Sequence, residues 1–249
     1  MDSDPTSALT PVLSHDAAMA LLRDGDIDVV GRLVDASNAT LFCRIQSGDV
    51  AASCIYKPRA GERPLWDFPT GTLSRREVAA FEVSQSMSWN IVPPTVWRDG
   101  PFGPGMVQLW IDVDETVDLV ELVHSETEQL RRIAVFDVVI NNADRKGGHL
   151  LPTANGELFG IDHGVAFSIE NKVRTLLWQW EGEPLPVDTV ADLQDLAEQL
   201  RGGDLSHQLV AMLDRQEILA TKKRVSELLR TGVHPGPGSD WPAIPWPPF

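Results

Sequence analysis

The sequence predicts an α+β fold in two lobes, with strands gathered in the first part of the chain and helices in the second. Residues 27–58 contain short runs rich in β-branched and aromatic residues, separated by polar turns such as QSGD. Residues 189–232 instead place apolar residues at helical spacing. A length of 249 residues with 43% hydrophobic content allows one domain or two small lobes.

The first lobe, residues 1–110, is expected to be an antiparallel sheet with one helix, preceded by a short N-terminal helix. Ser14 can cap a short helix that Gly25 ends. A second helix, within residues 74–89, begins with Ser74 and Glu77 at capping-box spacing. The expected strands are 27–34, 39–45, 50–58, 90–99 and 105–112. The first three form an antiparallel meander, and two prolines place the fourth at a sheet edge or a strand start.

The second lobe, residues 111–233, is expected to be mostly helical. Its only predicted sheet is a small hairpin, made by LLPT and LFGID around the turn TANGE. The segment LWQWEGEPLP is predicted to be a loop or a short helix. Residues 234–249 contain too much proline for regular structure and form a Pro/Trp-rich tail. The expected helices cover about 117–142, 189–203, 204–213 and 215–232.

Composition excludes several classes of protein. The formal charge of −15 argues against sequence-independent nucleic-acid binding and against strong attraction to anionic lipid. No apolar run is long enough for a transmembrane segment and the start lacks a signal-peptide pattern, so we expect a cytoplasmic protein. Cys43 and Cys54 are too few for a disulfide framework and are expected as small apolar residues in neighbouring strands.

The segment VINNADRKGGHLL, followed by LFGIDHGVAF, has the spacing that phosphoryl transfer requires. That chemistry needs a carboxylate beside the attacking hydroxyl, a second carboxylate for divalent metal and commonly another metal ligand five residues after the first. Asp144, Asp162 and His149 occupy these positions, and the hairpin between them should carry both carboxylates to one side of a cleft. The alternative is that both aspartates are turn residues.

Lys57, at the end of the apolar strand CIYKP, is the candidate for gripping nucleotide phosphates. A carboxylate on the following helix would hold it, with Glu77 as the candidate and Glu82 as the competitor. A capping box with Ser74 is the other interpretation of Glu77, and an ordinary surface lysine is that of Lys57.

Two further segments are assigned to the nucleotide with less support. Ser37, Asn38 and Thr40 lie between the first two strands of the meander and could cover phosphates, although an ordinary hairpin turn explains them equally well. Gln108, Leu109 and Trp110 link the lobes, where backbone groups would meet the adenine edge, an inference from position alone.

These motifs resemble the phosphatidylinositol 3-/4-kinase superfamily, especially type II phosphatidylinositol 4-kinases and short actinobacterial proteins related to them. NNADRKGGH is similar to the NxDRxxxN catalytic loop, GIDHGVAF to the IDxGxxF metal motif, and YKP, NIVPPT and VQLW to the lysine strand, a later strand and the hinge. The resemblance spans roughly residues 30–170. It implies a bilobal protein-kinase-like fold, ATP and Mg²⁺ or Mn²⁺, with Asp144 catalytic, Asp162 on the metal, and Lys57 and Glu77 on the nucleotide.

Two departures from the family pattern shape the functional prediction. His149 stands where the family has Asn, and because imidazole suits softer ions than Mg²⁺, we expect Mn²⁺ to support activity at least as well. The cysteine-rich palmitoylation stretch of the type II lipid kinases is absent, which puts a lipid acceptor in doubt.

The leading prediction is an ATP-dependent kinase that phosphorylates a hydroxyl of a protein Ser/Thr, a small polyol or an inositol lipid. The alternatives are AMP transfer and a nucleotide-binding pseudokinase that works as an interaction module. Lys172 and Arg174, in the place of a substrate loop, could neutralise an anionic substrate. Trp178 and Trp180 are expected to pack in the core rather than to stack on a ligand.

Overall fold

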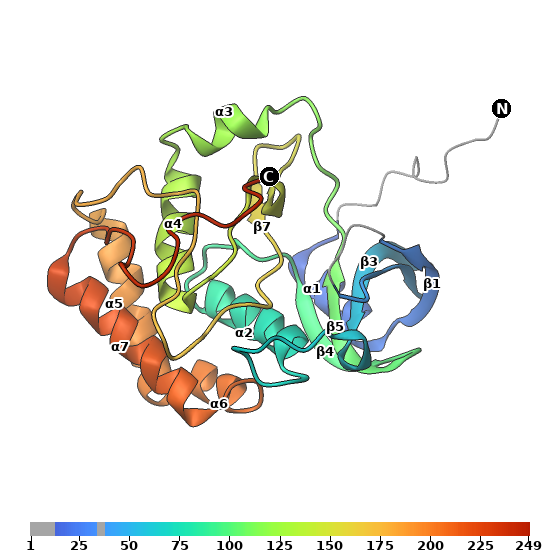
Figure 1. Ribbon diagram of the computed structural model, residues 1–249. Coiled ribbons are helices and arrows are strands. Elements are labelled where there is room, and N and C mark those ends of the chain that lie inside the picture. Colours follow the sequence, from blue (N-terminus) through green and yellow to red (C-terminus); the bar gives the residue numbers. More distant parts are fainter. Residues whose placement is uncertain (1–12, 34–37) are drawn as a thin grey trace. The chain divides into compact units, whose positions relative to one another are not determined.

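A computed structural model of the chain describes residues 13–33 and 38–249, which fall into two compact units (Figure 1). Unit 1 contains the described residues up to Arg63 together with Pro94–Trp110. Unit 2 contains Pro64–Pro93 and Ile111–Phe249.

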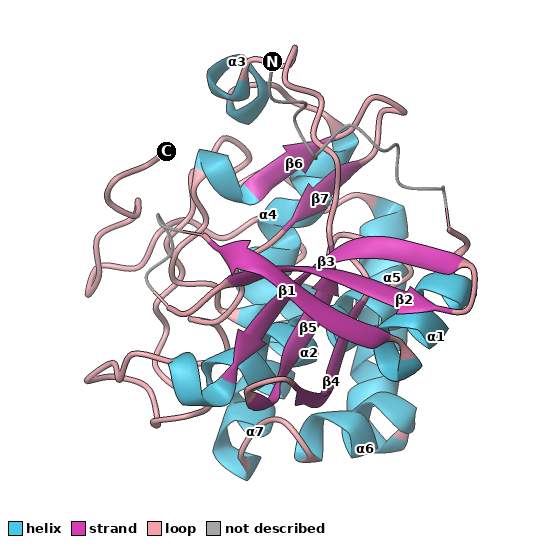
Figure 2. Cartoon of the chain, turned by 90° about the vertical axis from the view of Figure 1, so that its right-hand side faces the viewer, coloured by secondary structure: helices cyan, strands magenta, loops and turns pink. Residues whose placement is uncertain are grey.

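Unit 1 is built on a five-stranded antiparallel sheet in the order β1-β2-β3-β5-β4 (Figure 2). The meander of the first three strands is as predicted, and the strand after the proline pair lies at an edge, as expected. The bounds are α1 His15–Asp24, β1 Asp26–Arg32, β2 Leu41–Ser47, β3 Val50–Pro58, the 3₁₀ turn η1 Arg59–Gly61, β4 Thr95–Gly100 and β5 Gly103–Leu109.

Alternation along β2 and β3 creates the apolar face of this sheet. Cys43 and Cys54 lie directly opposite each other in the register, and both are free and fully buried. They are therefore the small apolar residues in neighbouring strands that the sequence predicts. Helix α1, capped by the Ser14 side chain as expected, packs against the sheet. The Arg98 guanidinium on β4 donates to the carbonyl oxygen of Gly25 at 2.8 Å, which fixes the end of that helix.

Unit 2 is mostly helical, and its only named sheet among the described residues is a two-stranded hairpin. The core comes mainly from buried leucines and β-branched residues of α4, α5 and α7, in contact with one another. The bounds are α2 Leu73–Ser86, α3 Leu119–Val123, α4 Glu128–Ile140, the 3₁₀ turn η2 Gly147–His149, β6 Leu150–Pro152, β7 Leu158–Gly160, α5 Val187–Gly202, α6 Asp204–Val210 and α7 Arg215–Thr231.

Helix α2 differs from the prediction in two ways. Its N-cap is Thr72, and Ser74 is the second helical residue, so the capping box expected between Ser74 and Glu77 is not formed. The helix also groups with unit 2 rather than with the sheet of unit 1. The physical reason is its buried side: the Arg76 guanidinium forms an ion pair with Glu217 of α7 and donates to the Ala166 carbonyl oxygen at 2.7 Å.

None of the helices in the described part of the chain is both long and apolar enough to cross a bilayer.

Candidate active site

The 144–149 loop follows helix α4, whose last turn is shaped by two consecutive asparagines. Asn141 ends the helix in the left-handed conformation at φ 55°, which Asn tolerates better than most residues. Its side-chain amide donates to the carbonyl oxygens of Ser168 and Glu170 at 2.8 and 2.6 Å. The Asn142 side-chain oxygen accepts from the backbone N–H of Asp144 at 3.1 Å. The start of the loop is therefore held by side chains as well as by the backbone.

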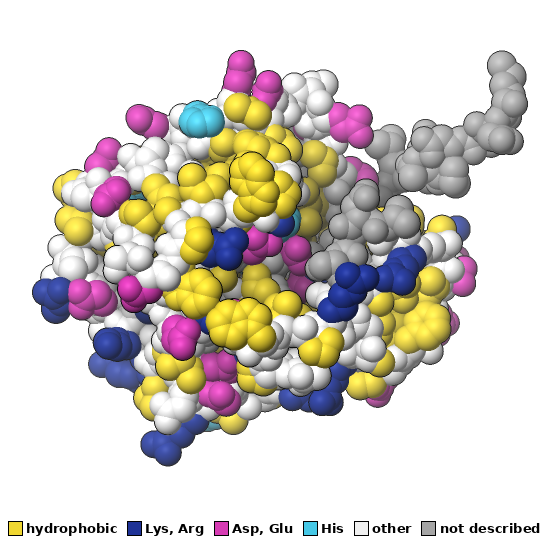
Figure 3. Space-filling model, in the orientation of Figure 1, with side chains coloured by type: hydrophobic (Ala, Val, Ile, Leu, Met, Phe, Trp, Pro, Cys, Tyr) yellow, Lys and Arg dark blue, Asp and Glu magenta, His cyan; other side chains and the backbone are white. Residues whose placement is uncertain are grey.

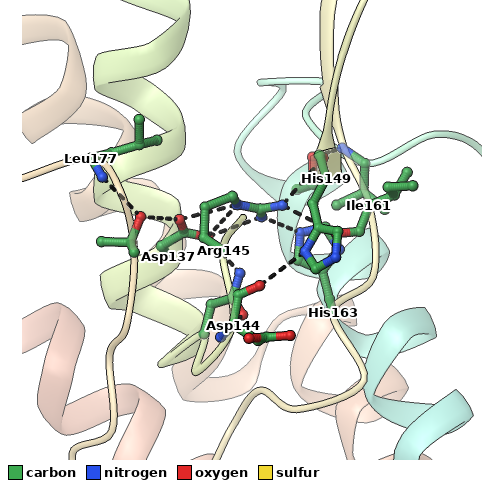
Figure 4. A network of polar contacts seen from close by, with 11 residues as sticks. Asp137, Asp144, Arg145, His149, Ile161, His163 and Leu177 are labelled. Atoms are coloured by element: carbon green, nitrogen blue, oxygen red, sulfur yellow. Dashed lines mark hydrogen bonds and ion pairs between the residues drawn. The ribbon is translucent and has the colours of Figure 1, made fainter. Parts of the chain in front are cut away.

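A fully buried ion pair fixes the middle of this loop. Arg145 and Asp137 of α4 are both 0% exposed, with 3.0 Å between guanidinium Nη2 and carboxylate Oδ1 (Figure 4). Asp137 also accepts from the Asn142 amide at 2.9 Å and from the Thr175 hydroxyl at 3.1 Å. The other side of the Arg145 guanidinium donates to the Ile161 carbonyl oxygen at 3.1 Å, which ties the loop to the end of the hairpin. Because both Arg145 and Asp137 make further hydrogen bonds, this buried ion pair can offset the free-energy cost of removing its charges from water.

His149 connects Asp144 with Asp162. Its Nδ1 lies 2.9 Å from the backbone carbonyl oxygen of Asp144, and because a carbonyl can only accept, this nitrogen carries the proton. In the neutral ring Nε2 carries the lone pair, and this nitrogen lies 3.4 Å from the Asp162 carboxylate (Figure 4 shows the His149 side of this arrangement). The structure thus brings together the three residues that the motif spacing singled out.

His149 Nε2 faces the Asp162 carboxylate, and this arrangement indicates whether the two residues fit a metal ion. Two electron-pair donors that approach each other repel unless a proton or a metal cation lies between them. Burial lowers the pKa of His149, an effect that the Asp162 charge opposes, so the imidazole favours its neutral form. A neutral imidazole oriented by a carbonyl and beside a carboxylate is a usual pattern of metal ligation, so the pair fits a divalent cation.

Two ligands do not complete a site. The described residues contain no group of three or more His, Cys, Asp or Glu side chains arranged to hold a metal. Mg²⁺ and related ions in phosphotransferases commonly use one or two carboxylates and take further oxygens from the substrate phosphates. His149 and Asp162 match that incomplete type of site.

The backbone at Asp162 is left-handed, and the segment after it lies beside helix α2. Asp162 has φ 62°, a left-handed conformation that Asp and Asn adopt more readily than other non-glycine residues. Two residues on, a Cβ at Gly164 would lie 3.6 Å from Glu77 Oε1, so Glu77 of α2 reaches the metal motif. Glu77 is 3% exposed, whereas Glu82 is only partly buried. Glu77 is therefore the more buried of the two glutamates and lies beside the segment that carries Asp162.

Asp144 combines partial burial with nearby positive charge. Burial raises the pKa of its carboxyl, and the charge of the Lys146 ammonium opposes that rise. The Lys146 ammonium is 3.3 Å from the Asp144 carboxylate, whose side chain remains 27% exposed. A carboxylate with a raised pKa that still reaches solvent can orient a hydroxyl and accept its proton.

The nucleotide residues expected from unit 1 lie on its sheet. Lys57 pairs with Met106 across β3 and β5, and its side chain is half-buried on the face opposite the buried Tyr56. Gln108 is buried and its amide donates to the Thr95 hydroxyl at 2.9 Å, while Leu109 ends β5. The Trp110 ring packs edge-on against Phe42, with 5.0 Å between centroids.

The segment expected to cover phosphates is only partly described. Ser37 lies outside the described residues. Asn38 accepts from the backbone N–H of Arg63 at 2.8 Å, and Thr40 is buried. The Asn38 side chain is thus bound to the segment that follows β3 and η1, 25 residues further along the chain.

The expected role of Lys172 in binding an anionic substrate is wrong. Its side chain is 4% exposed and its ammonium is paired with Asp67 at 3.1 Å and with Glu170 at 3.3 Å. Arg174 remains half-buried. Trp180 is buried in the core as predicted, and the Trp178 indole donates to the Ala243 carbonyl oxygen at 3.0 Å.

Sequence reasoning missed the polar network that supports the site. Asp137 shares a buried face of α4 with Leu130 and Ile133, where an apolar residue would be expected. A carboxylate in such a position needs a buried partner, and the neighbouring DR motif offered one in Arg145. Contacts between the tail and the loop had no comparable signal in the sequence.

The family model for phosphatidylinositol 3- and 4-kinase matches residues 106–213, which include Asp144, His149 and Asp162. Protein Rv2133c of Mycobacterium tuberculosis (strain ATCC 25618 / H37Rv) is 43% identical over 270 residues, covering 94% of this chain and 96% of that protein.

Solved structures show the same fold at low sequence identity. The Golgi casein kinase with Mn and ADP bound has a TM-score of 0.60 at 14% identity, covering 87% of this chain and 75% of that one. The Helicobacter pylori proinflammatory kinase CtkA has a TM-score of 0.51 at 11% identity, covering 85% of this chain and 94% of that one. These matches confirm the predicted bilobal, kinase-like α+β fold. The chain belongs to the phosphatidylinositol 3- and 4-kinase superfamily.

Proposed function

We propose that this protein transfers the γ-phosphoryl group of ATP to a hydroxyl acceptor. The observation that carries the proposal is the convergence of the Asp144 loop, His149 Nε2 and the Asp162 carboxylate, with 3.4 Å between the last two. Family membership and the kinase fold of the structural neighbours support a phosphotransferase in general. The proposed acceptor classes are a protein Ser/Thr, a small polyol and an inositol lipid.

In this proposal Asp144 orients the acceptor hydroxyl and takes its proton as the oxygen attacks the γ-phosphorus. A bond forms between that oxygen and phosphorus, the bond from phosphorus to the bridging oxygen of ADP breaks, and ADP leaves with the electron pair. Lys146, 3.3 Å from Asp144, adds positive charge where phosphate oxygens would arrive. The raised pKa of Asp144 improves its capacity as a proton acceptor.

His149 and Asp162 would hold a divalent cation, Mg²⁺ or Mn²⁺, which when bound neutralises charge on the phosphates. The structural neighbour solved with Mn and ADP supports use of a nucleotide and a divalent metal. Lys57 and Glu77 are proposed as the nucleotide lysine and its carboxylate partner, on the motif resemblance and, for Glu77, on its position beside Gly164.

The first experiment incubates the protein with γ-labelled or α-labelled ATP and each metal, with candidate proteins, polyols and inositol lipids as acceptors. We expect γ-label transfer that falls at least about 100-fold in Asp144→Asn, since that variant keeps the shape but loses the base. Asp49→Asn, in the exposed turn between β2 and β3, is the matched control and should retain wild-type transfer.

Two other outcomes would redirect the assignment. Transfer of α-label would indicate AMP transfer. Binding of ATP without any Asp144-dependent transfer would favour the pseudokinase alternative, which the replacement of the family's Asn by His149 makes worth testing.

A further inference from the structure

The Pro/Trp-rich tail, residues 234–249, forms no helix or strand, yet it follows the surface of unit 2 closely (Figure 1, dark red). Apolar side chains gather around its end on the face shown in Figure 3. Three contacts hold it, and together they connect the tail to the 144–149 loop.

The first contact surrounds Lys172. Its ammonium lies 4.5 Å from the ring centroid of Trp241 in the tail and 5.4 Å from that of Trp66. The two tryptophan rings stack on each other, with 6.2 Å between centroids and 24° between planes. A nearly buried ammonium over two aromatic faces is a stabilising arrangement, so Trp241 anchors the tail to the segment that begins at Lys172.

The second contact lies two residues further along the tail. The Ala243 carbonyl oxygen accepts from the backbone N–H of Thr175 at 3.1 Å and from the Trp178 indole at 3.0 Å. The backbone N–H of Arg145 in turn donates to the Arg174 carbonyl oxygen at 3.0 Å. The tail, the segment around Thr175 and the 144–149 loop are thus joined by consecutive backbone hydrogen bonds.

The third contact is made to the loop directly. The Gly147 backbone N–H donates to the Pro248 carbonyl oxygen at 2.9 Å. A Cβ at Gly147 would lie 2.2 Å from two carbons of the Phe249 ring, so the ring occupies the space that a side chain would need. Gly147 lies between Asp144 and His149 in the chain, so a displacement of its backbone would also displace these two residues.

We propose that residues 241–249 act as a positioning element that holds the 144–149 loop in its productive geometry. With the tail in place the Asp144 and Asp162 side chains remain 27% and 47% exposed, so the tail supports the loop without covering its carboxylates. Small displacements of catalytic groups lower the reaction rate strongly. The tail therefore contributes to turnover by keeping Asp144 in position. This role rests on the proposed phosphotransferase function.

A pair of glycine substitutions tests the contact. Gly147→Ala would push against the Phe249 ring and is expected to lower kcat by about tenfold or more, with a smaller change in the KM for ATP. Gly202→Ala, at the exposed end of α5, is the matched control, because a Cβ there also meets no atom within 4 Å, and it should keep wild-type turnover.

Phe249→Ala approaches the same contact from the tail. It should also lower kcat, whereas Ile244→Ala, on the same tail and with the same 49% exposed fraction, should not. Removing the ring relieves the clash in Gly147→Ala, so the double variant should match Phe249→Ala instead of adding the two losses. A role in stability alone would lower the melting temperature of Phe249→Ala and leave its kcat per folded molecule unchanged.

Hydrogen exchange of the 144–150 backbone separates this proposal from the proposed function. Phe249→Ala should exchange faster there than wild type and Ile244→Ala should not, whether or not any transfer is detected. Unchanged exchange in Phe249→Ala would overturn the proposal. Increased turnover in that variant would also overturn it, since the tail would then block the site. If the wild-type protein shows no turnover but Phe249→Ala still exchanges faster than wild type, the kinase assignment is contradicted while the contact between the tail and the loop is supported.

Discussion

At the scale of single residues, His149 is the position that most distinguishes this site. The family pattern has Asn there, and the imidazole presents Nε2 to Asp162 at 3.4 Å while Nδ1 is engaged by the Asp144 carbonyl oxygen. The Asp144 carbonyl oxygen therefore orients the ring. The chemistry of this position differs from the family pattern because His149 presents an imidazole nitrogen where Asn would present an amide.

We expect His149→Asn to shift metal preference toward Mg²⁺. Imidazole favours later transition metals over Mg²⁺, whereas an amide oxygen does not, so the ratio of turnover with Mn²⁺ to turnover with Mg²⁺ should fall. Metal titrations of ATP turnover measure this ratio. His124→Asn, at an exposed histidine at the end of α3, is the control and should leave the ratio unchanged. An equal ratio in wild type and His149→Asn would contradict a metal role for the imidazole.

His234 provides a pH-dependent contribution to stability. Burial and the neighbouring Arg131 lower the pKa of this imidazole to about 4, and its Nε2 accepts from Arg131 Nε at 3.0 Å. Between the ordinary pKa of 6.5 and pH 4 the unfolded chain binds a proton that the folded chain does not. The free energy of unfolding should therefore fall as pH falls through this window, by at most about 3 kcal/mol.

Urea unfolding at several pH values from 7 to about 4 measures this dependence. His234→Gln keeps a side-chain acceptor and cannot titrate, so its free energy of unfolding should change less across the window. The same slope in both proteins would show that other groups control it.

At the scale of elements, the pairing of α2 with α7 illustrates how buried charge organises unit 2. Arg76 and Glu217 are 1% and 7% exposed, and Glu217 also completes the capping box of α7 with Asp214. Removing one partner leaves the other charge buried, a change that typically costs about 3–5 kcal/mol.

We therefore expect Arg76→Met to destabilise the protein by about that amount, measured by denaturant unfolding. Arg230→Met, which breaks the exposed pair of Arg230 with Glu227 on the same α7, is the matched control and should shift the transition little. Similar shifts in the two variants would mean that burial of the Arg76 pair is not what matters.

At the scale of the whole molecule, nucleotide binding should appear as added stability. A ligand that binds only the folded state raises the free energy of unfolding by about 2.7 kcal/mol at 100 times its Kd. ATP with Mn²⁺ should therefore raise the melting temperature of the protein.

Asp162→Asn should lose the metal-dependent part of that increase. Asn accepts the left-handed backbone of position 162, φ 62°, so the variant should fold normally without ligand. Asp49→Asn should keep the full increase. A metal-dependent shift in Asp162→Asn equal to that of wild type would contradict the proposed role of this carboxylate.

Most of the elements and the local motif follow from the amino-acid sequence alone. Strand alternation, helical spacing and proline placement predicted the meander, the edge strand and the hairpin, because these depend on neighbours close in the chain. Asp144 and His149 directly precede a single hairpin and Asp162 directly follows it, so their convergence could be expected before the structure.

Contacts between residues far apart in the sequence became known only from the folded structure. Glu77 lies beside Gly164 rather than in a capping box, Lys172 is buried among Asp67 and two tryptophans, and Phe249 rests on Gly147. Each of these contacts joins segments separated by many tens of residues. Local propensity does not predict such pairs, because these charged and aromatic side chains come into contact only when the chain is folded and packed.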